Sequence, residues 1–265
     1  MTRISFDQIK DFESNTNDCY FLDCSCLKNN KIYIPANCQA DIEIESISAL
    51  QEIEFEVGDD SFINIAILNK NPLGNFKFLA NLGNNVNLSV FFADLSNGNS
   101  NVNGCFNLNG RNIKFHWCLA SLSSNNDNKK FDITINHNNF ETTGKSENFG
   151  ICKDDSNLVF TGESKICNGC KKSKANQAAR IMVFDEKSKA EATPILIIDE
   201  NDIEASHSAA VGKINDEQLF YLTSRGVDEA EAKKLITYGY LSPVLRGFID
   251  DDKKEQVAAL IKEKM

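Results

Sequence analysis

The sequence predicts a mostly β fold: a solenoid of short strands followed by a small helical subdomain at the C-terminus. Three observations lead to this prediction. Apolar and polar residues alternate with period two from about residue 32 to residue 203, no helical pattern interrupts this run, and helix-capping signals begin only after Gly212. We therefore divide the 265 residues into a short N-terminal segment (1–30), a β core (31–211) and a C-terminal helical subdomain (212–265).

In the N-terminal segment we predict one short helix, at Phe6–Phe12. In the β core, strict alternation means that one face of each strand is buried and the other is wet. The alternating apolar sets are Ile42/Ile44, Ile53/Phe55/Val57, Ile63/Ile65/Ile67, Phe76/Phe78, Val86/Leu88/Val90/Phe92, Ile113/Phe115/Trp117/Leu119 and Phe131/Ile133/Ile135. They recur every 10 to 12 residues, and the Asn-rich clusters Ser96–Asn103 and Ser123–Asn128 predict turns between them.

This pattern leaves a sandwich, a barrel or a solenoid open. Unbroken short strands over roughly 170 residues are long for one sandwich. Asn-rich corners also suit stacked coils, in which equivalent side chains form ladders. We therefore favour the solenoid.

Helical signals define the C-terminal subdomain. Asn215 is an N-cap candidate with Gln218 at the third helical position, and Arg225-Gly226 gives the stop. Asp228 with Glu231 repeats the capping pattern, and a last helix is expected around Lys253–Lys262. An interior proline costs a helix about 3 kcal/mol, so Pro243 predicts a kink or a new helix start.

Composition excludes several classes of function. The net charge of −10 disfavours general nucleic-acid binding and docking on an anionic membrane. The N-terminus lacks the apolar run of a signal peptide, and the longest aliphatic stretch, Ile195–Ile198, is too short to span a bilayer. We therefore expect a cytoplasmic protein, in which the nine cysteines are free thiols or metal ligands.

Residues 205–226 read A-S-H-S-A-A-V-G-K-I-N-D-E-Q-L-F-Y-L-T-S-R-G, and V-D-E-A-E-A-K-K-L-I follows up to Ile236. Upstream lie Phe160-Thr-Gly162, Gln177 and Ala190-Glu-Ala-Thr-Pro-Ile-Leu196. This set resembles the signature of the SufB/SufD family over roughly residues 135–250, with a histidine ending the β-helix before a short link and a helix. Over residues 1–130 the likeness is only a shared β pattern.

The resemblance implies a right-handed parallel β-helix with a C-terminal helical subdomain. It also implies pairing of the β-helix with a SufB-like chain or a second copy, and binding of a SufC-like ABC ATPase to the helices. The ATP site belongs to SufC, so we expect a non-catalytic scaffold with no tightly bound cofactor and at most a transient iron–sulfur cluster. Ala179 and Ser208 stand where SufB has cysteine and glutamate, which makes the chain more SufD-like, although it is shorter than usual members.

His207 is the leading candidate for contact with a cluster or its metal. A neutral imidazole suits iron and can replace cysteine on one iron of a cluster, and the family presents a histidine here to the partner subunit. The alternative is a histidine that caps strand carbonyls at the solenoid end. Cys167 and Cys170 form a C-x-x-C, which can bring two thiolates onto one metal. The sequence has no second pair of cysteines at matching spacing. The alternative is therefore a turn in which the two thiols bind no metal.

Other thiols and carboxylates give weaker signals. Cys19, Cys24 and Cys26 complete a metal set only if the fold brings them near Cys167 and Cys170. His116 and Cys118 share one strand face, which is too little for a metal site without partners from other strands. The row Glu52/Glu54/Glu56 alternates with apolar residues, as on a plain solvated strand.

The helical tail carries more large apolar residues than a small subdomain need bury, which favours a partner-binding surface over simple packing on the last coil. The candidates are Leu219, Phe220, Leu222, Arg225, Leu235, Tyr238 and Tyr240. Three other readings stay open: a cysteine-rich iron or zinc carrier or sensor, a carbohydrate-active β-helix enzyme, and a polymerising architectural solenoid. Bound metal would favour the carrier or sensor, and a groove of clustered charges would favour the enzyme. End-to-end stacking of the chains would favour the architectural solenoid.

Overall fold

The computed structural model describes residues 2–3, 18–23, 30–45 and 47–265. The helix expected at Phe6–Phe12, and the cysteines Cys24 and Cys26, lie outside these residues.

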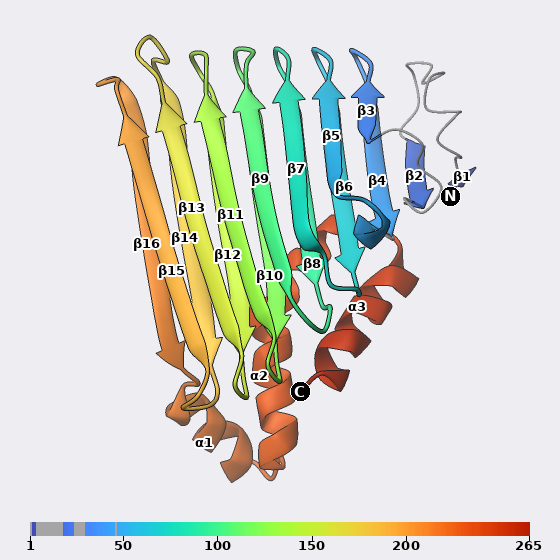
Figure 1. Ribbon diagram of the computed structural model, residues 1–265, viewed down its shortest axis with the longest axis vertical. Helices are drawn as coiled ribbons and strands as arrows, with labels where there is room; N and C mark the ends of the chain where they lie inside the picture. The colour runs from blue at the N-terminus through green and yellow to red at the C-terminus, as the bar shows by residue number, and fades with distance from the viewer. Residues whose placement is uncertain (1, 4–17, 24–29, 46) are drawn as a thin grey trace.

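From β2 onward, successive strands alternate between two sheets, and all the strand pairings of the described residues are parallel (Figure 1). The nine-stranded sheet contains, in spatial order, β1 (Thr2–Arg3), β2 (Asp18–Asp23), β4 (Gln39–Glu45), β6 (Phe62–Asn69), β8 (Asn87–Asp94), β10 (Lys114–Ser123), β12 (Thr143–Cys152), β14 (Ser173–Val183) and β16 (Ile203–Lys213). The seven-stranded sheet contains β15 (Lys189–Ile198), β13 (Asn157–Ile166), β11 (Asn128–His137), β9 (Ser100–Leu108), β7 (Gly74–Leu82), β5 (Glu52–Val57) and β3 (Lys31–Ile34). Parallel stacking of alternate strands is a β-solenoid, so that prediction is confirmed and the antiparallel sandwich is excluded.

The repeat is longer than the alternation suggested. Strands β8 to β11 begin at residues 87, 100, 114 and 128, so their starts lie 13 to 14 residues apart rather than 10 to 12. The cluster Ser96–Asn103 is also not all turn, because β9 begins at Ser100. Asn101 and Asn103 belong to the wet face of β9, where Asn101 Nδ2 donates to Asn75 Oδ1 of the preceding coil at 2.8 Å. Ladder bonds between coils outweigh the weak strand propensity of asparagine.

Aromatic side chains from both sheets fill the space between them. Phe55 stacks on Phe78 with ring centroids 5.3 Å apart, and Phe106 stacks on Phe115 of the opposite sheet at 4.4 Å. Trp117 packs edge-on against Phe92 at 5.9 Å. These rings are fully buried and form a continuous apolar core along the solenoid.

Three helices and a 3₁₀ turn follow β16: α1 (Asp216–Ser224), α2 (Glu229–Leu241), η4 (Ser242–Gly247) and α3 (Asp251–Glu263). Asn215 and Asp228 cap α1 and α2 as expected, and Asn215 Oδ1 accepts from the Gln218 amide at 3.0 Å. Pro243 opens η4, so the predicted new start is confirmed. A further one-turn 3₁₀ helix, η3, spans Ile47–Ala49. Within the described part of the chain no helix has the length and apolar character needed to cross a membrane.

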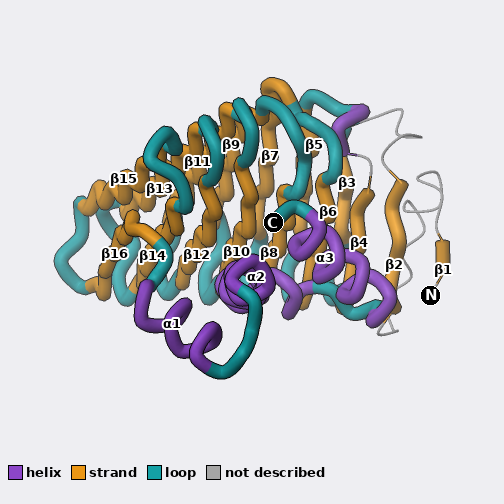
Figure 2. The backbone as a smooth tube through the Cα atoms, turned by 90° about the horizontal axis from the view of Figure 1, so that it is seen from below, coloured by secondary structure: helices purple, strands orange, loops and turns teal. Residues whose placement is uncertain are grey.

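The helices cover the outer face of the nine-stranded sheet (Figure 2). Val244, Phe248, Val257 and Ile261 pack there against apolar side chains of β6 to β14. Polar contacts fix the position, because Asn64 Nδ2 donates to the Gly247 carbonyl at 2.8 Å. The helical subdomain is therefore docked on the solenoid rather than tethered to it.

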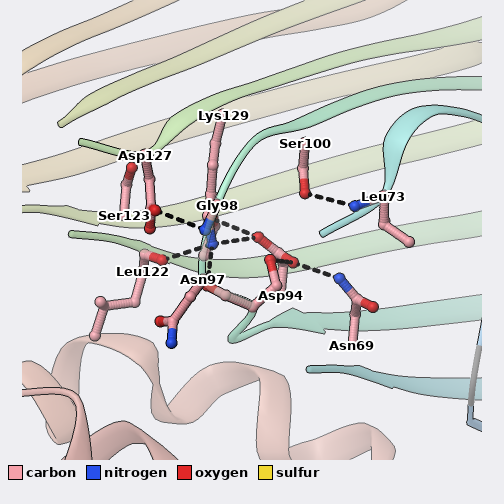
Figure 3. A network of polar contacts seen from close by, with 12 residues as sticks. Asn69, Leu73, Asp94, Asn97, Gly98, Ser100, Leu122, Ser123, Asp127 and Lys129 are labelled. Carbon is pink, nitrogen blue, oxygen red and sulfur yellow. Dashed lines mark hydrogen bonds and ion pairs between the residues drawn. The ribbon is translucent and has the colours of Figure 1, made fainter. Parts of the chain in front are cut away.

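Inside the corner between β8 and β11 lies a polar network (Figure 3). The Lys129 ammonium donates to Asp94 Oδ2, Ser96 O and Leu122 O, each at 2.8 Å. Asp94 Oδ1 in turn accepts from Asn69 Nδ2 at 2.7 Å and from Ser96 Oγ at 2.9 Å. Every hydrogen of the buried ammonium therefore has an acceptor, which is the condition for burying such a charge.

Candidate functional site

The last coil of the solenoid is open. β15 and β16 are the outermost strands of their sheets, so each has one edge without a neighbour among the described strands. Ile197, Ile198 and Val211 are exposed on this coil. Edge strands with apolar side chains invite pairing with another chain.

His207 lies within β16, six residues before its end, and its side chain is exposed. The histidine is therefore part of a strand, and the glycine-bearing segment expected to link it to the helices is the rest of that strand. In the parallel pairing His207 lies opposite Gln177 of β14. Partners in register share a face of the sheet, so His207 stands on the same inner face as the buried Gln177. It is exposed because no further described coil covers it.

Beneath His207 the interior is polar. Gln177 Nε2 donates to Ser164 Oγ at 2.7 Å and to the Ile195 carbonyl at 3.1 Å. Its Oε1 is buried and has no hydrogen-bond partner among the described groups. Gly162 leaves the room for this amide, since a Cβ there would lie 3.0 Å from Gln177 Oε1. At this position the inner face carries amide and hydroxyl groups, while Phe160, Ala179 and Ile181 of the same coils still belong to the apolar core.

A second exposed surface lies between α1 and α2. None of the side chains of α1 is buried, and Phe220 and Tyr221 are 72% and 57% exposed. Beside them is an open hollow of about 780 Å³. Its lining is Met182, Asn215, Glu217, Gln218, Tyr221, Leu222, Leu235, Ile236, Gly239 and Tyr240.

The structure brings together some of the seven predicted partner-binding residues. Leu222, Leu235 and Tyr240 line the hollow. Phe220 and Arg225 are exposed on and just after α1, and Leu219 is half-buried.

Tyr238 lies elsewhere, against the apolar cluster under the helices, with Lys262 Nζ 5.3 Å from its ring centroid. Sequence reasoning missed Tyr221, although it lies beside Phe220 in the same motif. The Arg225 guanidinium lies 5.3 Å from its ring.

Cys167 and Cys170 lie in a corner turn between β13 and β14. Cys167 is exposed and Cys170 is buried. Among residues 30–265, apart from the few whose placement is not described, no group of three or more His, Cys, Asp or Glu side chains could hold a metal ion. Cys105, Cys118 and Cys152 belong to the separate strands β9, β10 and β12.

His116 and Cys118 lie on the face of β10 that the helices cover. His116 Nε2 is 2.8 Å from Glu147 Oε2, and the Phe91 ring meets the imidazole edge-on. Burial lowers the pKa of His116, and the nearby Glu147 opposes this shift. Arg246 Nη2 of η4 is 3.7 Å from the same carboxylate. This cluster therefore holds the helices onto the sheet.

These features describe a parallel β-solenoid with a docked helical subdomain and two exposed surfaces. The family model for the SUF system FeS cluster assembly SufBD core domain matches residues 27–240, which is most of the chain. The chain therefore belongs to the SufBD family.

Three relatives illustrate this similarity. Iron-sulfur cluster assembly protein SufD of Bacillus subtilis is 28% identical over 277 residues, covering 88% of this chain and 63% of the relative. SufD of Escherichia coli is 26% identical over 158 residues, covering 60% of this chain and 37% of the relative. A SufBD family protein of Pyrococcus horikoshii is 36% identical over 96 residues, covering 36% of this chain and 21% of the relative. The chain thus spans less than two thirds of the length of these relatives.

Proposed function

We propose that this chain is a non-catalytic scaffold subunit of a SUF-type iron–sulfur assembly complex. Its α1–α2 surface recruits a SufC-like ABC ATPase, and its open last coil pairs with a SufB-like chain or with a second copy. The observation that carries the proposal is α1: a helix of the SufBD family chain that buries none of its side chains and exposes two adjacent aromatic residues. Exposed aromatic residues beside an apolar hollow are typical anchors of a protein interface.

The last coil supports the pairing half of the proposal. Two strand edges and the exposed Ile197, Ile198 and Val211 offer both main-chain hydrogen bonds and apolar area to a partner. His207 stands among them on the inner face, where a partner coil would cover it. An iron–sulfur cluster in contact with His207 is then cargo held between two chains. The scaffold itself works in the cytoplasm, with no resident cofactor.

The ATPase half is tested with the variant Phe220→Ala/Tyr221→Ala. Both side chains are exposed, so the fold is kept, while an interface loses two aromatic anchors worth about 2 kcal/mol or more each. We expect the Kd for a SufC-like ATPase, measured by titration calorimetry, to rise at least tenfold. Phe62→Ala is the matched control, because Phe62 is a 53% exposed aromatic residue of β6, far along the solenoid from β16. Unchanged affinity in the double variant would contradict ATPase binding at this surface.

Deletion of residues 215–265 is a poorer test. Val244, Phe248, Val257 and Ile261 bury the outer face of the nine-stranded sheet. Removing them would expose Phe91 and Phe149 and favour aggregation, so loss of ATPase binding would have two explanations. The point variants in α1 avoid this ambiguity.

A further inference from the structure

The C-x-x-C segment between β13 and β14 is a tight turn. The Cys170 amide donates to the Cys167 carbonyl at 3.1 Å, and Gly169 has a φ of +88°. This is the pattern of a type II β-turn with cysteines at its first and last positions. The two Cα atoms of such a turn lie within about 7 Å, close to the range of roughly 4.4–6.8 Å that disulfides span.

The two thiols have different surroundings. Cys167 is exposed, whereas Cys170 is 3% exposed and its Sγ donates to the His137 carbonyl at 3.1 Å. Burial chiefly raises the pKa of the Cys170 thiol. Lys165, two residues before Cys167, pairs its ammonium with Glu163 Oε1 at 2.7 Å, and this carboxylate chiefly raises the pKa of Lys165. The pair therefore combines an accessible thiol with a protected thiol next to it in the turn.

We propose that Cys167 and Cys170 form a redox site that closes reversibly as a disulfide within this turn. The Cys167 thiolate attacks one sulfur of a small disulfide such as oxidised glutathione and releases one glutathione thiolate. Cys170 then gives its proton to solvent, and its sulfur attacks Cys167 Sγ and expels the second glutathione thiolate. Two protein thiols are oxidised and one glutathione disulfide is reduced to two thiols, so the exchange balances.

The turn contacts the open end of the solenoid, so closing a disulfide in it changes contacts of the last coil. Asn168 Nδ2 donates to the Asp199 carbonyl at 3.3 Å, and the Gly169 amide donates to Glu200 Oε2 at 3.0 Å. Both acceptors belong to the corner that joins β15 to β16. Cys170 also packs in a small apolar cluster with Leu196 and Ile203 of these strands. Oxidation removes the S–H that now donates to His137, so the state of the pair bears directly on the contacts beneath the last coil.

Peptide mapping of the full chain tests the proposal. Trypsin cleaves after Lys165 and Lys171, so the peptide Ile166–Lys171 contains both cysteines and no other. The purified protein is incubated with oxidised glutathione, its remaining thiols are alkylated, and it is digested. We expect this peptide to lack both alkyl groups and two hydrogens, and to become doubly alkylated when dithiothreitol precedes alkylation. Recovery of a doubly alkylated peptide from the oxidised sample would overturn the proposal.

Two variants separate this disulfide from other thiol chemistry. Cys170→Ser removes the resolving thiol and should trap glutathione on Cys167. Cys105→Ser is the control, because Cys105 lies in β9, outside the turn, and the closed peptide should persist. A wild-type protein that ends as glutathionylated Cys167, or as a Cys105–Cys167 disulfide, would also refute closure within the turn. None of these readouts involves the ATPase, so their failure would leave the scaffold proposal standing.

Discussion

Lys129 and Asp94 form an ion pair of 2.8 Å in which neither side chain has exposed surface. Asp94 ends β8 of the nine-stranded sheet and Lys129 is the second residue of β11 in the seven-stranded sheet, so the pair joins the two sheets at a corner. Its energetics are decided by desolvation. A buried charge whose partner is removed keeps its desolvation cost and loses the attraction that offset it.

Lys129→Met should therefore destabilise the protein by about 3–5 kcal/mol in denaturant unfolding, because it leaves the Asp94 carboxylate buried and unpaired. Lys130→Met is the adjacent control, since the Lys130–Asp132 pair is largely exposed and should cost less than about 1 kcal/mol. Adding Asp94→Asn to Lys129→Met removes the orphan charge but keeps an acceptor for Asn69. That double variant should recover most of the unfolding free energy that Lys129→Met loses. Equal costs for Lys129→Met and Lys130→Met would show that the buried pair has no special role.

A second prediction concerns the contact between η4 and the sheet. A Cβ built on Gly247 would lie 2.2 Å from the Phe91 ring, so Gly247→Ala must push the helical subdomain or the ring aside. We expect a loss of about 1–3 kcal/mol and faster amide exchange in α3. Gly239→Ala is the control. A Cβ there meets nothing within 4 Å, and alanine in a helix should stabilise by about 0.5–1 kcal/mol. Unaltered exchange in α3 for Gly247→Ala would refute the tight docking.

The same docking gives a pH-dependent prediction. Glu43 Oε1 accepts from the Ile249 and Asp250 amides at 3.2 and 3.3 Å, while Oε2 is buried without a partner among the described groups. Burial chiefly raises the pKa of Glu43; the two amides and Lys253 lower it, and Asp250 raises it further. Because the folded pKa lies above the unfolded value of about 4.3, ionisation in the fold costs stability. This cost is absent below the unfolded pKa, grows as the pH rises between the two pKa values, and is complete above the raised pKa.

Glu43→Gln keeps the acceptor but cannot ionise. Its stability relative to the natural protein should therefore be higher at pH 7 than at pH 4, when thermal unfolding is compared at both values. Glu43→Ala removes the acceptor as well and should be less stable at both. A constant difference between Glu43→Gln and the natural protein across this range would refute a raised pKa.

Much of this architecture is visible in the sequence. The alternation around Ile53 and Phe55 correctly identified inner faces, because burial of one face imposes period two. Alternation is the same in a sandwich and a solenoid, so the stacking of coils was predicted from the length of the strand region, the corner asparagines and the family resemblance. The docking of the helices had a signal that was not used. Apolar runs without alternation at 65–68, 90–93 and 117–120 mark strands buried on both faces, and the helices cover these strands. Which face His207 occupies depended on register, which no local pattern fixes.

The corners of the solenoid provide a fourth prediction. Asn85, Asn112, Glu141 and Lys172 occupy equivalent left-handed positions, with φ of 53° to 58°. The asparagines bond to one another, with Asn112 Nδ2 3.1 Å from Asn85 Oδ1. Lys172 instead makes a 3.5 Å ion pair with Glu141 whose partners are 69% and 46% exposed, and such a pair is worth little. Lys172→Gly should therefore stabilise by about 0.5–1 kcal/mol, since glycine adopts positive φ freely. Lys171 has a negative φ, so Lys171→Gly should destabilise the protein. A change in unfolding free energy of the same sign in both variants would contradict a role for the positive φ.

The last prediction concerns His207. Its side chain is exposed and stands on the inner face of the open coil. His207→Ala should therefore leave thermal stability within about 0.5 kcal/mol of the natural protein. If the imidazole contacts a nascent cluster, the same change should lower the yield of cluster in reconstitution with the ATPase and a SufB-like partner. Ser208→Ala is the control, because Ser208 is the next residue of β16 and faces the other way. Equal cluster yields from His207→Ala and Ser208→Ala would remove the histidine from the assembly chemistry and leave the last coil with a pairing role alone.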